Sequence, residues 1–409
     1  MGLLSLLGAS LMPILQVLIL CVLGAFMATD YLKLFPLTAR RSLNRIVFSV
    51  FTPALVFSSL AKTVRLQDLI SWWFMPVNIG ITFLLGGTLG WIAVKIIKPQ
   101  PYLQYLVIAM CATGNLGNIM VVLIPAMCEE DGNPFGDKAR CRSIGLSYAS
   151  LSMALGCFYM WTYTYHLIQN SKVTYRAMFP DAVQVEDEEN ASKEPNKDLE
   201  ASHTTLLLNH QDTALPMRGT SHDLKMMQRG GVWKQMLGVS RQILDELKAP
   251  PVVAAIIGFV FGAVSWLRNL IIGDNAPLGV ISDSLTIIGD ATIPCINLIL
   301  GGNLTQGFNK SKMSPKLGMV VIVVRYMLLP GMGIGVVKGA AYLGLLPADP
   351  LFQFVLMVQY TLPPAMNIGT MTQLVDVAQE ECSVLFLWTY IAAAFALTAW
   401  STVFMWTLS

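Results

Sequence analysis

Residues 106–119 read LVIAMCATGNLGNI, and residues 356–368 read LMVQYTLPPAMNI, so an apolar segment is interrupted twice in the chain. In the second copy, Pro363 and Pro364 remove two successive backbone donors and clash with the preceding turn. A helix therefore cannot run cleanly through that point. In the first copy, glycine and asparagine stand where a lipid-facing helix would carry leucine. We predict two broken helices of the same kind.

These interruptions belong to a longer internal repeat. Residues 11–26, LMPILQVLILCVLGAF, recur as residues 249–264, APPVVAAIIGFVFGAV. Residues 48–60 recur in the same way as residues 289–301. Repeated apolar segments with breaks at corresponding places are typical of secondary transporters, and the breaks indicate where the substrate binds. The matched residues are Pro13 with Pro251, Gly24 with Gly262, Pro53 with Pro294, and Asn118 with Asn367.

The composition is that of an integral membrane protein. Of 409 residues, 54% are hydrophobic and 13% are charged, against about 25% charged in an ordinary soluble domain. A soluble chain of this length could not bury so much apolar surface in one core. The formal net charge of +2 gives no reason to expect a nucleic-acid partner. The bilayer is the expected environment.

Apolar stretches of about 20 residues are the length that crosses a bilayer. We predict an all-α polytopic membrane protein with ten transmembrane helices, arranged as two inverted five-helix repeats with crossed broken helices four and nine. The repeats cover residues 1–168 and 250–409, and a polar, largely disordered loop covers 169–249. The predicted spans are 11–29, 44–62, 72–97, 103–127, 143–167, 252–271, 282–302, 316–341, 351–376 and 383–406.

Lys and Arg near the span ends are slightly more numerous on the side of the central loop. By the positive-inside rule we expect that loop in the cytosol and both termini on the lumenal or exterior side. Cys128 and Cys141 flank a short loop on the opposite side and could pair in an oxidising lumen. We favour free thiols that pack as small hydrophobic groups.

The two breaks are expected at the interface of the repeats, because unsatisfied backbone is tolerated only inside the protein or beside water. The positive ends of the second half-helices would then face one cavity and favour an anion. Asn115, Asn118 and Asn367 would supply amide groups there, beside Gly117. The alternative is a proline kink with small-residue packing between helices.

Further polar residues on nearby spans are plausible cavity liners, although each could equally form an interhelical hydrogen bond. Apolar walls are expected from Phe51, Leu55 and Ile119. The polar candidates are Gln16, Tyr148, Asn297 and Gln359.

Ionisable residues inside the spans are functional candidates. Asp290 is the carboxylate expected well inside an apolar span, where it could carry a coupling proton or serve only as a structural, hydrogen-bonded Asp. Arg325 could pair with a substrate carboxylate or with Asp290, but we favour extension of its head group to the interface. Enzyme signatures are absent from the sequence, so we expect no enzyme, no cofactor and no metal site.

Four stretches resemble the auxin carriers of plants. LNRIVFSVFTPALVF (43–57) resembles their second span, and three later stretches resemble spans seven, eight and nine. The whole pattern is most similar to the PIN-LIKES branch. The later stretches are ISDSLTIIGDATIPCINLILGG (281–302), VVRYMLLPG (323–331) and MVQYTLPPAMN (357–367).

The resemblance implies a scaffold and a transport half, residence in the endoplasmic reticulum, and transport of indole-3-acetic acid and similar auxins, with a homodimer possible. Asn118 falls on the asparagine of the family's fourth-span crossover, where Gly117 replaces a proline. Pro363 falls on the first proline of the ninth-span crossover, and Asn367 replaces a later one. The alternatives are a sodium- or proton-coupled transporter of another organic anion, and a non-transporting receptor that binds auxin.

Overall fold

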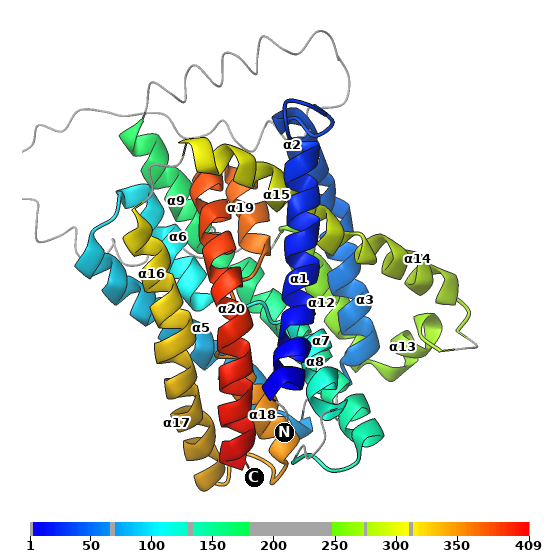
Figure 1. The fold of residues 1–409 in the computed structure, drawn as a ribbon. Coiled ribbons are helices and arrows are strands. Elements are labelled where there is room, and N and C mark those ends of the chain that lie inside the picture. The colour runs from blue at the N-terminus through cyan, green and yellow to red at the C-terminus, as the bar shows by residue number, and fades with distance from the viewer. Residues whose placement is uncertain are drawn as a thin grey trace, which may run out of the picture. The chain divides into compact units, whose positions relative to one another are not determined.

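The computed structural model describes residues 3–65, 70–129, 134–179, 248–273, 276–310 and 314–408. In these ranges the chain is helical, and an isolated bridge between Gly114 and Pro364 takes the place of any strand (Figure 1). The chain divides into two compact units, Met1–Lys172 with Glu246–Ser409, and Val173–Asp245. The candidate site and the side-chain contacts described below lie in the first unit.

The described residues of the first half form two single helices and three that are interrupted or changed in pitch. Residues 47–51 and 160–164 are π-helical turns within longer helices. Helix α9 continues past the predicted end of the first repeat at 168, and most of the predicted central loop lies outside the described residues. The elements are α1 (Leu3–Met27), α2 (Leu37–Ile46), η1 (Val47–Phe51), α3 (Thr52–Thr63), α5 (Phe74–Ile97), α6 (Pro101–Ala112), α7 (Asn118–Glu129), α8 (Lys138–Tyr159), η2 (Met160–Thr164) and α9 (Tyr165–Met178).

The second half repeats the pattern of long helices and one clear break. Three of its helices begin at a proline, which is tolerated in the first turn because its missing N–H has no intrahelical acceptor there. The elements are α12 (Pro250–Ala263), α13 (Ser265–Ile271), α14 (Gly279–Asp290), α15 (Thr292–Lys310), α16 (Pro315–Val323), η4 (Val324–Leu328), α17 (Leu329–Tyr342), α18 (Pro350–Val358), α19 (Asn367–Val375) and α20 (Gln379–Leu408).

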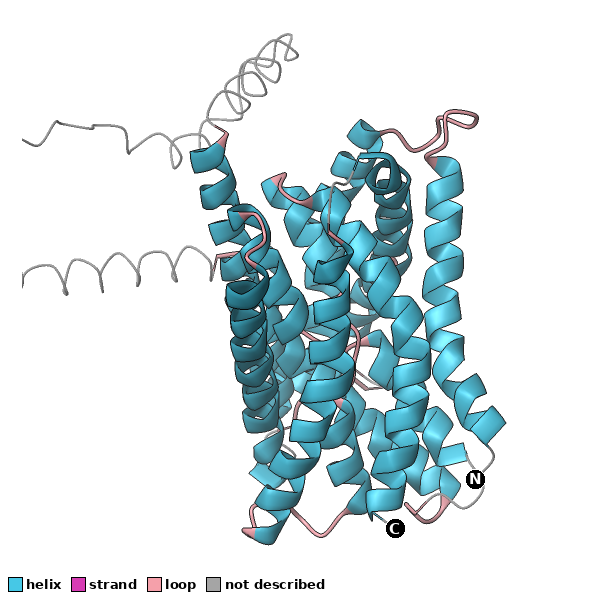
Figure 2. Cartoon of the chain, turned by 60° about the vertical axis from the view of Figure 1, so that its left-hand side comes forward, coloured by secondary structure: helices cyan, strands magenta, loops and turns pink. Residues whose placement is uncertain are grey.

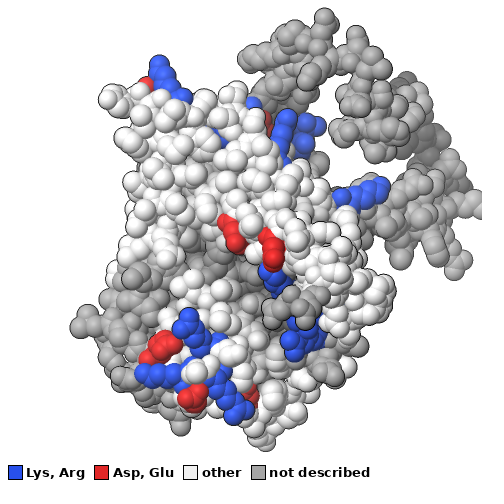
Figure 3. All heavy atoms as spheres, turned by 90° about the vertical axis from the view of Figure 1, so that its right-hand side faces the viewer, with Lys and Arg blue, Asp and Glu red and all other residues white. Residues whose placement is uncertain are grey.

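Among the residues that the structure describes, six helical stretches are long and apolar enough to cross a membrane, and the bent pair α12 and α13 would make a seventh. This confirms the prediction of a polytopic helical membrane protein, while the count of ten stays a prediction. The face in Figure 3, on the side of α13 and α14, is mostly uncharged. Large apolar side chains are exposed there, as expected for contact with lipid. The six stretches are Leu37–Lys62, Phe74–Ile97, Lys138–Met178, Gly279–Thr305, Pro315–Tyr342 and Gln379–Leu408.

Two helix pairs approach so closely that glycine is required at the contact. In the pair α1 and α15, a Cβ added at Gly24 would lie 2.2 Å from the carbonyl oxygen of Leu298. In the pair α3 and α12, a Cβ at Gly262 would lie 2.7 Å from the carbonyl oxygen of Leu60. Gly24 and Gly262 are the residues that the sequence repeat aligns. The same kind of close contact therefore occurs twice, each time between a helix of one half and a helix of the other.

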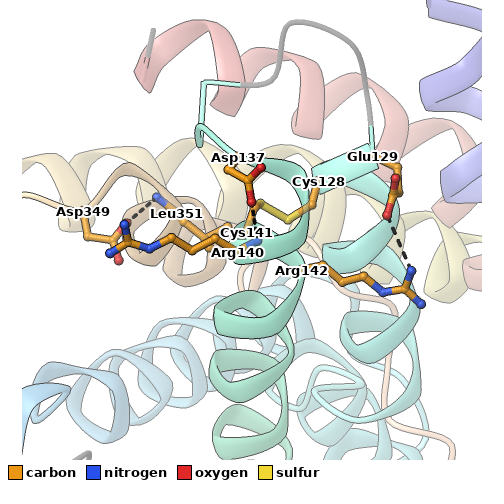
Figure 4. Close-up of a disulfide and its surroundings, with 8 residues drawn as sticks. All are labelled: Cys128, Glu129, Asp137, Arg140, Cys141, Arg142, Asp349 and Leu351. Carbon is orange, nitrogen blue, oxygen red and sulfur yellow. Dashed lines mark hydrogen bonds and ion pairs between the residues drawn. A yellow bond between two sulfur atoms is a disulfide. The ribbon is translucent and has the colours of Figure 1, made fainter.

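A disulfide joins Cys128, at the end of α7, to Cys141, in the first turn of α8 (Figure 4). Our preference for free thiols at these two positions was wrong. Asp137 caps α8 by accepting a hydrogen bond of 2.9 Å from the backbone N–H of Arg140. Arg142 and Glu129 add an ion pair of 3.5 Å on the surface. The turn between α7 and α8 is thus held covalently and by its cap.

We expect the Cys128→Ser, Cys141→Ser double variant to be less stable by about 3 kcal/mol, since the bond restricts the unfolded chain over a loop of this length. Thermal unfolding in detergent, with and without reductant, measures the change. Reductant should lower the midpoint of the parent protein and leave that of the double variant unchanged. A parent protein insensitive to reductant would contradict the structure.

Candidate functional site

The two predicted breaks meet and pair through their backbones. Asn115 donates its N–H to the carbonyl oxygen of Pro363 at 2.7 Å, and Ala365 donates its N–H to that of Thr113 at 3.0 Å. The paired segments run antiparallel, with Gly114 opposite Pro364. Loop segments therefore lie inside the helix bundle as well as at its ends (Figure 2).

The sequence explains why the pairing takes this form. Pro363 and Pro364 have no N–H, so the second break can only accept backbone hydrogen bonds at these two residues. Ala365 supplies the first donor after them. On the other strand, Thr113 is extended with φ −99° and ψ 107°, which ends α6. The N–H groups of Asn115 and Ala365 and the carbonyl groups of Pro363 and Thr113 are thus satisfied across the two breaks. Buried backbone groups are rarely left without a partner, so the two breaks stabilise each other.

The side chain of Arg325 donates hydrogen bonds to the backbone of both breaks. This side chain is 0% exposed and comes from η4. Its Nε and Nη2 atoms donate to the carbonyl oxygen of Leu362, the first at 3.0 Å. Its Nη1 atom donates to the carbonyl oxygens of Cys111 at 3.0 Å and Ala112 at 3.5 Å. Our preference for a head group that extends to the interface was wrong.

The first break leaves the carbonyl groups of Cys111 and Ala112 without their helical N–H donors. In a continuous helix they would accept from Asn115 and Leu116. Here Asn115 donates to Pro363, and Leu116 donates to Gly114. The end of α6 also carries the partial negative charge of a helix C-terminus, about −0.5. A guanidinium is therefore stabilised there without a carboxylate, and none lies within 4.0 Å of it among the described residues.

A small cavity of about 70 Å³ borders the crossing. This volume is below the range of about 300–1,000 Å³ found for small-molecule sites. The N-terminal ends of α7 and α19 both reach it, through Gly117 and Asn367. Its walls are mostly apolar, and none of its lining residues is acidic. They come from α3 (Leu55, Val56, Ser59), the breaks (114–117 and 365–367), α8 and η2 (Met153, Ala154, Gly156, Cys157, Met160) and α15 (Thr292, Ile293, Ile296).

Two asparagines bring amide groups to this cavity. Asn115 donates from Nδ2 to the hydroxyl of Tyr390 at 2.9 Å, and that hydroxyl donates to the carbonyl of Pro364 at 3.0 Å. Tyr390 thereby fixes the orientation of Asn115. Asn367 lines the cavity, and its buried Oδ1 atom has no hydrogen-bond partner. A buried polar atom without a partner costs about 1–3 kcal/mol, so this oxygen is available to accept a hydrogen bond from a donor group of a ligand.

The predicted residues divide into those that line the cavity and those that do not. Asn115, Gly117, Asn367 and Leu55 line it. Pro363 and Pro364 do not line it, and they position the lining residues through the backbone pairing of the two breaks. Asn118 begins α7, and its side chain lies outside the described part. The predicted liners Phe51, Ile119 and Asn297 are not among the lining residues, and Gln16 is exposed.

Gln359 and Tyr148 form interhelical hydrogen bonds, the alternative that we left open. Gln359 is 0% exposed, accepts from Asn78 at 2.8 Å and donates to Ser152 at 2.9 Å. Tyr148 donates to Asp349 at 2.7 Å, near the start of α18. Neither residue lines the cavity, because each is held in a polar contact between α8 and α18 or its neighbours.

Asp290 is the last residue of α14 and is exposed. It falls within the apolar stretch Gly279–Thr305, as the sequence predicted. It does not line the cavity, and a helix junction falls between Asp290 and Thr292. A role in proton coupling stays a prediction. No carboxylate among the described residues takes its place at the cavity.

Sequence reasoning pointed to α8 and α15 through Tyr148 and Asn297, but it missed the residues of these helices that line the cavity. Met153, Gly156 and Cys157 lie on one face of α8, and Thr292 begins α15. A Cβ at Gly156 would lie 2.6 Å from Leu116, so glycine there admits the first break. A small residue on α8 at the depth of the breaks is the signal that could have found this wall.

Comparison with known proteins identifies the family of the chain. Residues 9–401 match the family described as Membrane transport protein, which is a family of transporters and not of enzymes. The chain is 56% identical over 410 residues to Protein PIN-LIKES 7 of Arabidopsis thaliana, with 100% of both chains covered. It is 54% identical over 405 residues to Protein PIN-LIKES 5, with 99% of each covered. It is 41% identical over 412 residues to Protein PIN-LIKES 3, with 99% of this chain and 98% of that protein covered. Both are also from Arabidopsis thaliana.

Proposed function

The chain belongs to the membrane transport protein family, in its PIN-LIKES branch, and from this premise we propose that it carries auxin-type organic anions, indole-3-acetate first among them. The observation that supports this most is the pairing of residues 113–115 with 363–365, which brings two helix N-termini to one cavity. Each N-terminus carries about half a positive charge, so together they balance one carboxylate. The apolar walls suit an aromatic ring.

For the fold, we propose ten spans in two inverted five-helix repeats. The two broken spans are α6 with α7 and α18 with α19, the fourth and ninth in order. Helices α1 and α12 would be the first span of each repeat. The matched glycine contacts of Gly24 on α15 and Gly262 on α3 support this, since an internal symmetry would exchange the two pairs. Inverted repeats give two states of similar energy, open to opposite sides.

We further propose alternating access of a transport half, spans three to five and eight to ten, against a scaffold half of spans one, two, six and seven. The crossing belongs to the transport half. The cavity is lined from both halves, by the breaks and α8 on one side and by α3 and α15 on the other. Relative motion of the halves would therefore open and close it.

For the location, we propose the endoplasmic reticulum membrane, with the central loop in the cytosol and both termini in the lumen. In this orientation the disulfide Cys128–Cys141 faces the lumen, an oxidising compartment in which such bonds persist. The bond thus agrees with the orientation that Lys and Arg favour.

The sequon at residues 303–305, NLT, should carry no glycan in this orientation. Asn303 is also buried, and its Oδ1 atom accepts a hydrogen bond from Arg40 at 2.7 Å. We expect no mobility shift on a gel after glycosidase treatment of the protein from membranes. A sequon engineered into residues 343–349, on the proposed lumenal side, should shift and serves as the control. A glycan on Asn303 would contradict the orientation.

Flux of radiolabelled indole-3-acetate into liposomes that contain the purified protein tests the proposed function. We expect saturable flux that is lost in Asn118→Ala and Asn367→Ala and kept in Gln16→Ala, a matched control on an exposed position. Flux that requires sodium or a pH gradient would indicate a coupled carrier. Binding without flux in folded protein would indicate a receptor, and neither binding nor flux would reject auxin as the substrate.

A further inference from the structure

A second buried polar cluster lies where α2, α15 and α19 meet, apart from the cavity. Its members are polar or charged, and each is at least nine-tenths buried. Arg40 donates from Nη1 to Asn303 at 2.7 Å, and Asn44 donates from Nδ2 to the carbonyl oxygen of Thr370 at 3.1 Å. The exposed fractions are 2% for Arg40, 1% for Asn44, 5% for Asn303, 2% for Thr370 and 6% for Gln373.

This cluster is poorly satisfied in the structure. Both amide atoms of Gln373, the Nε atom of Arg40, the Oδ1 atom of Asn44 and the Oγ1 atom of Thr370 have no hydrogen-bond partner. No carboxylate lies within 4.0 Å of Arg40 among the described residues. Unsatisfied polar atoms destabilise a closed interface, and a buried cation with only amide partners destabilises it further. Such a contact favours opening, or a ligand that supplies the missing acceptors.

Helix geometry places Gln373 beside Arg40. Thr370 and Gln373 are three residues apart and so lie on one side of α19, and Asp376 follows as the residue that ends the helix. Thr370 contacts Asn44, and Asp376 accepts two hydrogen bonds from Arg41, at 2.8 and 2.9 Å. Gln373 therefore faces α2 between those two contacts, at the level of Arg40. The glycine at 302 makes room, since a Cβ there would lie 2.8 Å from the Cδ atom of Arg40.

We propose that Arg40 and Gln373 form a second, transient site for the carboxylate group of the transported acid, inside a passage that is closed in this structure. Arg40 and Gln373 offer unused N–H donors, and a carboxylate offers two acceptor oxygens in one plane. The site rests on the proposed function and lies on its cytosolic side. Helices α2 and α19 lie toward the end of the bundle opposite the last residues of α20 (Figure 1).

The exposed ion pair between Arg41 and Asp376 closes the outer end of this passage. It joins α2, in the proposed scaffold half, to the end of α19, in the proposed transport half. An acid leaving the cavity toward the cytosol would pass from Asn367, at the start of α19, along Thr370 and Gln373 on the same helix. The polar face of α19 therefore leads from the first site to the second.

Exchange of indole-3-acetate across liposomes and its binding to the purified protein test this site. We expect Arg40→Met to slow exchange by about tenfold, the loss of one charge-assisted contact, with little change in the dissociation constant at the cavity. Arg40→Lys, which keeps the charge, should restore most of the rate. Arg45→Met, an exposed position on the same helix, should match the parent.

A second variant keeps the proposal testable if Arg40→Met does not fold. Gln373→Leu removes two unsatisfied buried atoms, so we expect a higher thermal unfolding midpoint together with slower exchange. A purely structural role for Gln373 would not combine these two effects. A parent protein without flux would reject the proposed function. Normal flux in Arg40→Met and Gln373→Leu, with flux in the parent, would reject this site alone.

Discussion

The Arg325→Met variant is expected to lose saturable transport and about 3 kcal/mol or more of unfolding free energy, because removing one partner of a buried charged contact is strongly destabilising. The guanidinium supplies donors to the carbonyls of Cys111 and Leu362. Both carbonyls are buried at the crossing, and leaving each without a donor costs about 1–3 kcal/mol. Part of this loss of unfolding free energy is offset, because the variant no longer buries a cation. Transport suffers more, since both breaks lose the side chain that joins them.

Denaturant titration in detergent and the flux assay measure the two effects. Arg325→Lys should rescue little, because a single ammonium cannot reach the carbonyls of both breaks as the planar guanidinium does. Arg45→Met removes an exposed arginine and should stay within about 0.5 kcal/mol of the parent. An Arg325→Met protein with normal stability and flux would show that the crossing does not depend on this side chain.

The Gly114→Ala variant is expected to lose transport by about tenfold or more while still folding. A Cβ at Gly114 would lie 2.5 Å from the Nη2 atom of Arg325, and Gly114 itself lines the cavity. The added methyl group must therefore displace the guanidinium or the paired strand. Overpacking of this kind costs about 1–3 kcal/mol, and about 1.4 kcal/mol corresponds to tenfold.

Gly335→Ala is the matched control, since a Cβ there has no atom within 4 Å. It adds the same methyl group at a position where the group contacts no other atom, so flux and stability should stay near those of the parent. Comparison of the two variants separates the effect of the crossing from that of adding a methyl group to a glycine. Equal flux in Gly114→Ala and Gly335→Ala would contradict the geometry of the crossing.

The breaks were predictable from the sequence because their causes are local. Pro363 and Pro364 have no backbone N–H to donate, and the glycine-containing stretch at residues 112–118 is unusual in an apolar span. The meeting of the breaks followed from the need to satisfy freed backbone groups away from lipid. Asn115, Gly117 and Asn367 reached the cavity for the same reason, since they belong to the breaks themselves.

The other features of the site and fold depend on contacts between residues that are distant in the sequence. Arg325 was assigned to the interface because the sequence does not show that carbonyls of Cys111 and Leu362 face it. Gln359 and Tyr148 were open between cavity and helix contact, and Asn78, Ser152 and Asp349 decide for the latter. The pairing of Cys128 with Cys141 depends on how the turn between α7 and α8 folds. Local pattern carries none of this information.

The central claim is that two helix N-termini at the crossing of the breaks recognise a single negative charge. Equilibrium binding of indole-3-acetate and of its uncharged amide to the purified protein tests this most directly. We predict that the amide binds at least about tenfold more weakly, as expected when a charge-assisted contact of about 1.5–3 kcal/mol is lost. The difference should shrink in Asn367→Ala. Equal affinity for the acid anion and the amide would contradict the account.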